Sequence, residues 1–349
     1  MMHDCADDQI VLRQELSSYL ETQGLSSFTV LGTDIFRLLH APGKLLSPSP
    51  PASRRIPLGF WAVLPLFIAR YCQPAAPPLV MQRVALACEL LHCALDYYDE
   101  LEDDDLSAER QDLGDGRLLN AATTLFVLSR RILASLVPSL LSYERYSQLT
   151  ELVDTELLLA MDGQHRDILV EQRDMSDMDP EECVLIAEAK AGTLVRLVCR
   201  LAACAVDARD EVVHLFAQFG LHLGIAFQLE NDTHDLEVAL SPSSTNKPLT
   251  RKSDLIRQKK TLPVILAAMQ YAQLQKCSSV ADRNIQAEQD SSVWNQAYAD
   301  AIQASLAGAS YHRECIKNLV PRLEAVQGVP LPPVLRWLLG LDENEEMPS

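Results

Sequence analysis

Two apolar segments of the chain each end in oxygen-bearing side chains spaced four residues apart. Asp99 and Asp103 follow the first segment, and Asn231 and Asp235 follow the second. On a helix, residues at this spacing lie on one face, one turn apart. Two such pairs facing each other would form a cage for a hard divalent cation, and magnesium held by few carboxylates keeps positions open for phosphate oxygens. The pattern therefore suggests an enzyme that handles a diphosphate.

The two clusters differ in how strongly they point to chemistry. His92 lies seven residues before Asp99, two helical turns back on the same face. A run of acidic residues is nonetheless commonly just a solvated helix end, and that interpretation stays open for the first cluster. The second cluster follows a nearly unbroken apolar run, 219–228. Carboxylates after such a buried segment need partners or metal, and acidic groups near a helix C-terminus also oppose the helix dipole.

Helices must position these clusters, because apolar residues recur at intervals of three and four along the chain. With 13 glycines and no run of alternating β-branched residues, the pattern predicts an all-α fold. The predicted helices cover 8–39, 58–72, 79–103, 118–136, 144–171, 181–206, 210–238, 260–275, 292–326 and 332–340. The intervening loops at 42–57, 73–78, 241–248 and 276–291 do not resemble domain linkers. We therefore expect one domain over 1–341 and a disordered acidic tail at 342–349.

Composition excludes several classes of partner. The net charge of -18 disfavours nucleic acid and anionic lipid. No apolar run reaches the roughly 18 to 20 residues that span a bilayer, and the acidic start lacks the features of a signal peptide. Nine cysteines without a Cys-x-x-Cys pair fit a reducing cytoplasm rather than a zinc site. The sequence thus predicts a cytoplasmic protein without a membrane span.

Five segments occur in a recognisable order. They are Glu89-x-x-His92 before Asp99-Glu100-x-x-Asp103, Gly163-Gln164-x-x-Asp167, Lys190-Ala-Gly-Thr-Leu194, Phe227-Gln228-x-x-Asn231-Asp232-x-x-Asp235, and Ser253-Asp254 followed by Lys259-Lys260-Thr261-Leu-Pro263. From about residue 40 to 270 this order resembles the trans-isoprenyl diphosphate synthases of the polyprenyl synthetase family. The resemblance implies a bundle of about ten helices around a central apolar cavity, of the isoprenoid synthase type, in a protein that forms homodimers.

The resemblance also implies roles for individual residues. Three Mg²⁺ ions would be held, two by Asp99, Asp103 and Asp105, and one by Asn231, Asp232 and Asp235. Catalysis would depend on Asp99, Asp103, Asp232 and Lys190, and the allylic diphosphate would contact Lys190, Gln228, Lys259 and Lys260. The metals would neutralise charge on the leaving diphosphate, and apolar walls would protect the allylic cation from water.

A second substrate, isopentenyl diphosphate, would be bound in such enzymes by Lys44, Arg55, His92 and Arg110. Here Gln111 stands where a second arginine is expected, and Asp96 stands where an apolar residue is usual. Arginine's bidentate fork suits phosphate, so the missing second arginine weakens the case for the second site. Three hypotheses remain open: a prenyltransferase that elongates prenyl diphosphates, a terpene cyclase or a prenyltransferase acting on a peptide or small molecule, and a non-catalytic partner of an active synthase. Product length, cyclisation and the physiological acceptor are not predicted.

Overall fold

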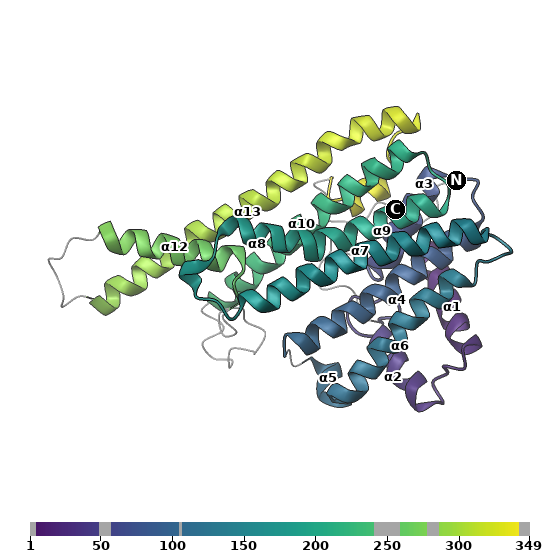
Figure 1. The fold of residues 1–349 in the computed structure, drawn as a ribbon, viewed down its shortest axis with the longest axis horizontal. Coiled ribbons are helices and arrows are strands. Elements are labelled where there is room, and N and C mark those ends of the chain that lie inside the picture. Colours follow the sequence, from purple (N-terminus) through teal and green to yellow (C-terminus); the bar gives the residue numbers. More distant parts are fainter. Residues whose placement is uncertain (1–4, 49–56, 105–106, 241–258, 278–285, 342–349) are drawn as a thin grey trace. The chain divides into compact units, whose positions relative to one another are not determined.

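The computed structural model describes residues 5–48, 57–104, 107–240, 259–277 and 286–341, and across these ranges it contains helices but no strand (Figure 1). The predicted all-α fold class is confirmed. The chain divides into two compact units. Unit 1 comprises Met1–Thr155, Arg196–Gly220 and Ile316–Ser349, and unit 2 comprises Glu156–Val195 and Leu221–Cys315. The single domain over 1–341 and the central cavity stay predictions.

Unit 1 is built around one long apolar helix. Its complete helices are α1 (Cys5–Thr22), α2 (Val30–Leu39), α3 (Phe60–Cys72), α4 (Pro78–Glu102), α5 (Ala108–Leu113), α6 (Asp115–Ala134) and α14 (Pro333–Leu338). The α4 helix packs against α3 and α6 (Figure 1), and nearly all of its residues from Val80 to Ala94 are buried. This packing fixes the helix that ends in the first acidic cluster.

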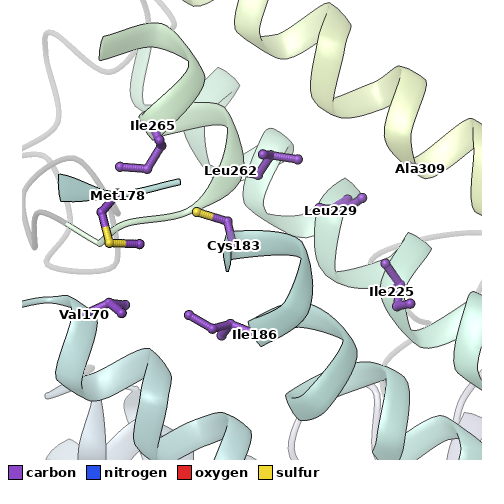
Figure 2. Packing of buried hydrophobic residues seen from close by; sticks show 9 residues of the cluster. All are labelled: Val170, Met178, Cys183, Ile186, Ile225, Leu229, Leu262, Ile265 and Ala309. Atoms are coloured by element: carbon purple, nitrogen blue, oxygen red, sulfur yellow. The ribbon is translucent and has the colours of Figure 1, made fainter. Parts of the chain in front are cut away.

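Unit 2 has its own apolar core, which Figure 2 shows from close by. Its complete elements are the 3₁₀ turn η1 (Met175–Asp177), α8 (Pro180–Ala187), the π-helical turn η2 (Glu188–Gly192) and α12 (Leu262–Cys277). Four further helices contribute residues to both units: α7 (Tyr143–Val170), α9 (Thr193–Ala205), α10 (Asp210–Leu240) and α13 (Gln286–Gln327). The core brings α7, α8, α10, α12 and α13 together through Val170, Met178, Cys183, Ile186, Ile225, Leu229, Leu262, Ile265 and Ala309.

The predicted secondary structure needs correction at three places. The helix predicted at 8–39 is broken between α1 and α2, because Gly24 adopts a left-handed conformation (φ +75°) and the Thr29 side chain caps α2 by accepting a hydrogen bond from the Gly32 N–H. The α5 helix was not predicted; Ser107 caps it in the same way. The polar stretch predicted as a loop at 276–291 is helical from Gln286. The predicted loop at 241–248 and the tail at 342–349 lie outside the described residues.

Two helices are long and apolar enough to cross a membrane by length and composition, Pro78–Glu102 and Asp210–Val238. In the fold, 72% and 56% of their most apolar windows are buried. A buried core helix passes the same test, so the signal is weak.

Candidate functional site

The first acidic cluster forms the C-terminal end of α4. Asp99 lies in its last turn, and the N–H of Asp103, the residue after the helix, donates to the Asp99 carbonyl at 2.8 Å. The Asp103 side chain is buried, and Asp104 turns the chain away in a left-handed conformation (φ +53°). The described part of the cluster is therefore a helix end followed by a tight turn. Asp105 lies outside the described residues.

Arg110 stabilises this turn through hydrogen bonds and ion pairs. Its guanidinium donates to Asp115 Oδ1 at 2.7 Å, to Asp104 Oδ1 at 2.8 Å and to the Glu100 carbonyl at 3.3 Å. Arg110 was predicted to bind a substrate phosphate. The structure places it next to the first acidic cluster and commits its donors to carboxylates and a carbonyl of its own chain. Its role in binding a phosphate stays a prediction.

A partly buried polar cluster lies further back along α4 and on the loop after α2. We call its four members, Lys44, Glu89, His92 and Asp96, the Lys44 cluster. The loop after α2 is fixed by a hydrogen bond from the Leu45 N–H to Glu89 Oε1 at 2.7 Å. The ammonium group of Lys44, the preceding residue, forms an ion pair with Asp96. The structure therefore brings Lys44 and His92 into one cluster, and their roles in binding isopentenyl diphosphate stay predictions. Arg55, the predicted companion of Lys44, lies outside the described residues.

His92 is held as a neutral imidazole. Its ring stacks on Trp61 with centroids 3.9 Å apart, and its Nδ1 lies 3.1 Å from the Cys88 carbonyl oxygen. Burial lowers the pKa of His92 to about 4. Because a carbonyl can only accept, Nδ1 carries the proton, and Nε2 presents a lone pair. That Nε2 is buried and has no hydrogen-bond partner among the described residues.

Glu89 carries a second buried acceptor. Its Oε2 has no hydrogen-bond partner in the described part of the chain. Burial raises the pKa of Glu89 to about 7, although the Lys44 charge and backbone donors act in the opposite direction. The Lys44 cluster thus contains one ammonium group, one ionised partner for it, and two buried acceptor atoms.

Lys190, in unit 2, lies on the π-helical turn η2. Its Nζ donates to Asp167 Oδ2 on α7 at 3.1 Å, and both side chains are mostly buried. The turn approaches α7 closely, since a Cβ atom added at Gly163 would lie 2.6 Å from the Lys190 backbone nitrogen. On its other side, a Cβ atom at Gly224 of α10 would overlap the Ala191 carbonyl oxygen. Glycine at both positions therefore lets η2 fit between the two helices.

The second acidic cluster lies on α10, which continues beyond it to Leu240. The Gln228 side chain donates to Asp232 Oδ1 at 2.8 Å, and Asp232 is buried. Asn231 and Asp235 are exposed. The amide donor orients the Asp232 carboxylate, a role of Gln228 that the sequence did not predict.

Lys260 and Asp232 both lie near the Cys183 thiol. Cys183 donates to the Lys260 carbonyl oxygen at 3.2 Å, and the Lys260 ammonium donates to the Glu171 carbonyl at 3.3 Å. Burial, with additional contributions from the charges of Asp232 and Asp167, raises the pKa of Cys183 to about 12. Unit 2 therefore gathers predicted diphosphate-binding lysines and a predicted metal ligand around α8. Lys259 is only partly buried.

The predicted metal ligands are divided between the two units. Among the described residues, no group of three or more His, Cys, Asp or Glu side chains lies together as a metal site. Asp99 and Asp103 belong to unit 1, whereas Asn231, Asp232 and Asp235 belong to unit 2. Their metal-binding roles stay predictions.

Four residues that shape these regions were not among the predicted site residues. Asp96 and Asp167 pair with the two lysines, Glu89 fixes the loop before α3, and Trp61 supports His92. Asp96 was visible as a departure from the family pattern, and Asp167 as part of a motif. No sequence signal identified Trp61, because its contact depends on how α3 packs against α4.

Comparisons with known proteins place these regions in a family. A sequence model of the polyprenyl synthetase family matches residues 62–301. The chain is 31% identical over 175 residues to the tryptophan prenyltransferase ComQ of Bacillus spizizenii, covering 50% of this chain and 54% of ComQ. It is 30% identical over 154 residues to a geranylfarnesyl diphosphate synthase of Aeropyrum pernix, covering 44% and 46%. The chain thus spans about half the length of these curated relatives.

Solved structures agree on the fold. Heptaprenyl diphosphate synthase from Staphylococcus aureus superposes with a TM-score of 0.71 at 16% identity, covering 98% of this chain and 96% of that one. A polyprenyl synthase from Caulobacter crescentus, complexed with calcium and isoprenyl diphosphate, gives a TM-score of 0.63 at 17% identity, covering 96% and 92%. At these identities the likeness shows the fold, which confirms the predicted isoprenoid synthase type. Because the family match includes both acidic clusters and Lys190, the chain belongs to the polyprenyl synthetase family of transferases.

Proposed function

We propose that the protein is a Mg²⁺-dependent prenyltransferase that ionises an allylic prenyl diphosphate and transfers its prenyl group to an acceptor. The observation that carries this proposal is the continuous family match over 62–301, within which both acidic clusters and their neighbouring lysines are retained. The homodimer and the cytoplasmic location expected from the sequence stay predictions.

The donor sets fit magnesium. Asp99, Asp103, Asn231, Asp232 and Asp235 offer hard oxygen ligands without thiolate or imidazole, which suits Mg²⁺ rather than a softer metal. Bound Mg²⁺ would neutralise the charge that develops on the leaving diphosphate. A solved family relative that contains calcium and isoprenyl diphosphate supports this pairing of divalent metal and substrate.

The chain's own groups would act on the same diphosphate. The ammonium groups of Lys190 and Lys260 add positive charge that attracts its oxygens, and the Asp167 carboxylate fixes where the Lys190 ammonium lies. Gln228 holds Asp232 in one orientation. None of these groups needs to act as a nucleophile, because departure of the diphosphate itself generates the reactive allylic cation.

Two classes of acceptor remain candidates. Isopentenyl diphosphate would make the protein a chain-elongating synthase, as the Aeropyrum pernix relative's name indicates for that protein. A non-phosphate acceptor would make it a transferase of another kind, as with the tryptophan prenyltransferase ComQ. The pairing of Lys44 with Asp96 and of Arg110 with Asp104 and Asp115 favours the second class, because these cations already have anionic partners.

Incubation of the full chain with Mg²⁺ and geranyl, farnesyl or geranylgeranyl diphosphate tests the proposal, with products identified by mass spectrometry. Longer diphosphates formed only with isopentenyl diphosphate would establish elongation. Hydrocarbon or alcohol formed from the donor alone would indicate a cyclase. It would also fit a prenyltransferase for a non-phosphate acceptor that ionises its donor when that acceptor is absent. Absence of pyrophosphate release from every donor, or full activity in EDTA, would contradict the proposal.

A further inference from the structure

The Lys44 cluster contains its own anion, the Asp96 carboxylate, beside the lysine that the family resemblance assigns to an acceptor diphosphate. We propose that Asp96 determines acceptor selectivity by holding the Lys44 ammonium in an ion pair, so that a diphosphate acceptor must displace the Asp96 carboxylate before it can bind. This inference rests on the proposed function and on the role in binding isopentenyl diphosphate that the family resemblance implies for Lys44.

The Asp96 carboxylate is placed so that it can compete with a diphosphate for the Lys44 ammonium group. The Lys44 side chain is only 12% exposed, and a buried ammonium needs an anionic partner. The Asp96 side chain is 48% exposed, so water can solvate its carboxylate once it is displaced. Asp96 also follows His92 by one helical turn, which places both residues on the same side of α4.

The other members of the cluster do not offset the Asp96 charge. The His92 imidazole is neutral, and its Nδ1 proton is directed to the Cys88 carbonyl. Its buried Nε2 and the buried Glu89 Oε2 can only accept hydrogen bonds while both groups lack a further proton. Phosphate oxygens also only accept, so these atoms suit an uncharged acceptor with an N–H or O–H group better than a diphosphate.

The loop that carries Lys44 is firmly held. The Leu45 N–H bonds to Glu89, the Gly59 N–H bonds to the Gly43 carbonyl at 3.1 Å, and Leu45 is completely buried. The loop backbone is therefore unsuited to carry Lys44 away from Asp96. For a diphosphate to reach Lys44, the Asp96 side chain must therefore move instead, and it can do so without disturbing the core.

Isothermal titration of isopentenyl diphosphate into the full chain, without prenyl donor, tests the inference. Asp96→Asn keeps the side-chain shape and removes the charge, and we expect it to tighten binding by about tenfold. Asp96→Ser should tighten binding in the same direction. Asp154→Asn is a matched control in the same unit, because Asp154 also pairs with a basic residue, Arg130, at 2.9 Å; its affinity should equal that of the wild type.

The role of Lys44 is tested by a double substitution. In a Lys44→Gln background, Asp96→Asn should give no gain, because the cation that it would release is gone. A gain of equal size with and without Lys44 would overturn the inference, since it would reflect general charge. Unchanged or undetectable binding by both Asp96 variants, with helical circular dichroism intact, would overturn it as well.

These results are separable from the proposed function. Pyrophosphate release from farnesyl diphosphate and Mg²⁺ is measured in parallel, without isopentenyl diphosphate. Its absence, with the other allylic donors also inert, would contradict donor ionisation, whereas the titrations would still show whether Asp96 controls access to Lys44. Donor ionisation combined with no effect of Asp96→Asn would overturn only the inference.

Discussion

Two regions each hold a lysine in place, but by different means. They are the Lys44 cluster of unit 1 and the Lys190 turn of unit 2, residues 188–192. Each holds a lysine against a carboxylate near a helix that bears an acidic cluster. Lys44 lies on a loop that is fixed by a hydrogen bond to the buried Glu89. Lys190 lies on a π-turn that is fixed by close contact with Gly163 and Gly224. The position of Lys44 therefore depends on the titratable carboxyl group of Glu89. The position of Lys190 depends on two glycines, which leave room for the turn because they have no side chain.

The largest expected effect is a loss of catalytic activity, and it should be similar for substitutions in the acidic clusters of both units. Asp99→Ala in unit 1 and Asp232→Ala in unit 2 should each lower kcat/KM by at least about a thousandfold if, as proposed, each carboxylate binds the Mg²⁺ that neutralises the leaving group. Steady-state pyrophosphate release measures this, and helical circular dichroism should be unchanged. Asp112→Ala, which removes a carboxylate paired with Arg37, serves as the control. If kcat/KM falls only tenfold or less in either variant, the acidic cluster that carries the substitution does not take part in the reaction.

The second effect should appear at the Lys44 cluster and not at the Lys190 turn. The pKa of Glu89 is raised from 4.5 to about 7, so its contribution to stability is fully present below pH 4.5 and is lost as pH rises through 7. The pKa of His92 is lowered from 6.5 to about 4, so its contribution is present above pH 6.5 and is lost as pH falls through 4. Between pH 4.5 and 6.5 the two oppose each other.

Glu89→Gln removes one of these opposing contributions. Relative to the wild type, the free energy of unfolding of the variant should rise with pH by about 1 kcal/mol per unit between pH 4.5 and 7. Urea denaturation at a series of pH values measures the difference. Glu182→Gln, at a carboxylate that pairs with Arg173 at the surface of unit 2, should run parallel to the wild type. A parallel curve for Glu89→Gln would show that Glu89 does not hold its proton in the fold.

The smallest effect should appear only in unit 2. Gly163→Ala places a methyl group 2.6 Å from the Lys190 backbone nitrogen, and overpacking of this kind costs about 1–3 kcal/mol of stability. Gly116→Ala is the control, because a Cβ atom there meets nothing within 4 Å; it should be neutral or stabilising by a few tenths to about 1 kcal/mol. Urea midpoints at pH 7 compare the two. Equal midpoints would mean that the turn accommodates the methyl group without strain.

The helices were predictable because their apolar periodicity persists over long segments. The α4 and α10 helices were expected at 79–103 and 210–238 and are found at Pro78–Glu102 and Asp210–Leu240. The break after α1 had a local signal, Gly24 followed by the capping residue Thr29, that the apolar pattern concealed.

The candidate site was less predictable, because its partners come from distant segments. The lysines were identified by motif, but a motif does not reveal which carboxylate pairs with each ammonium group. Residues 188–192 have an ordinary helical composition, and their π conformation depends on the approach of Gly163 and Gly224. The stacking of Trp61 on His92 likewise arises only after α3 packs against α4.

The π-turn has a consequence for how this part of the gene can change. Such a turn contains one residue more than a turn of α-helix. Deleting one codon within 188–192 would let Pro180–Ala205 run as a single regular helix, and each deleted residue rotates what precedes it by about 100°. Cys183 and Ile186 would then leave the core that they share with Leu229 and Ile265. A deletion here shifts the phase of the helix, so we expect length variants in this segment to be far less tolerated than substitutions.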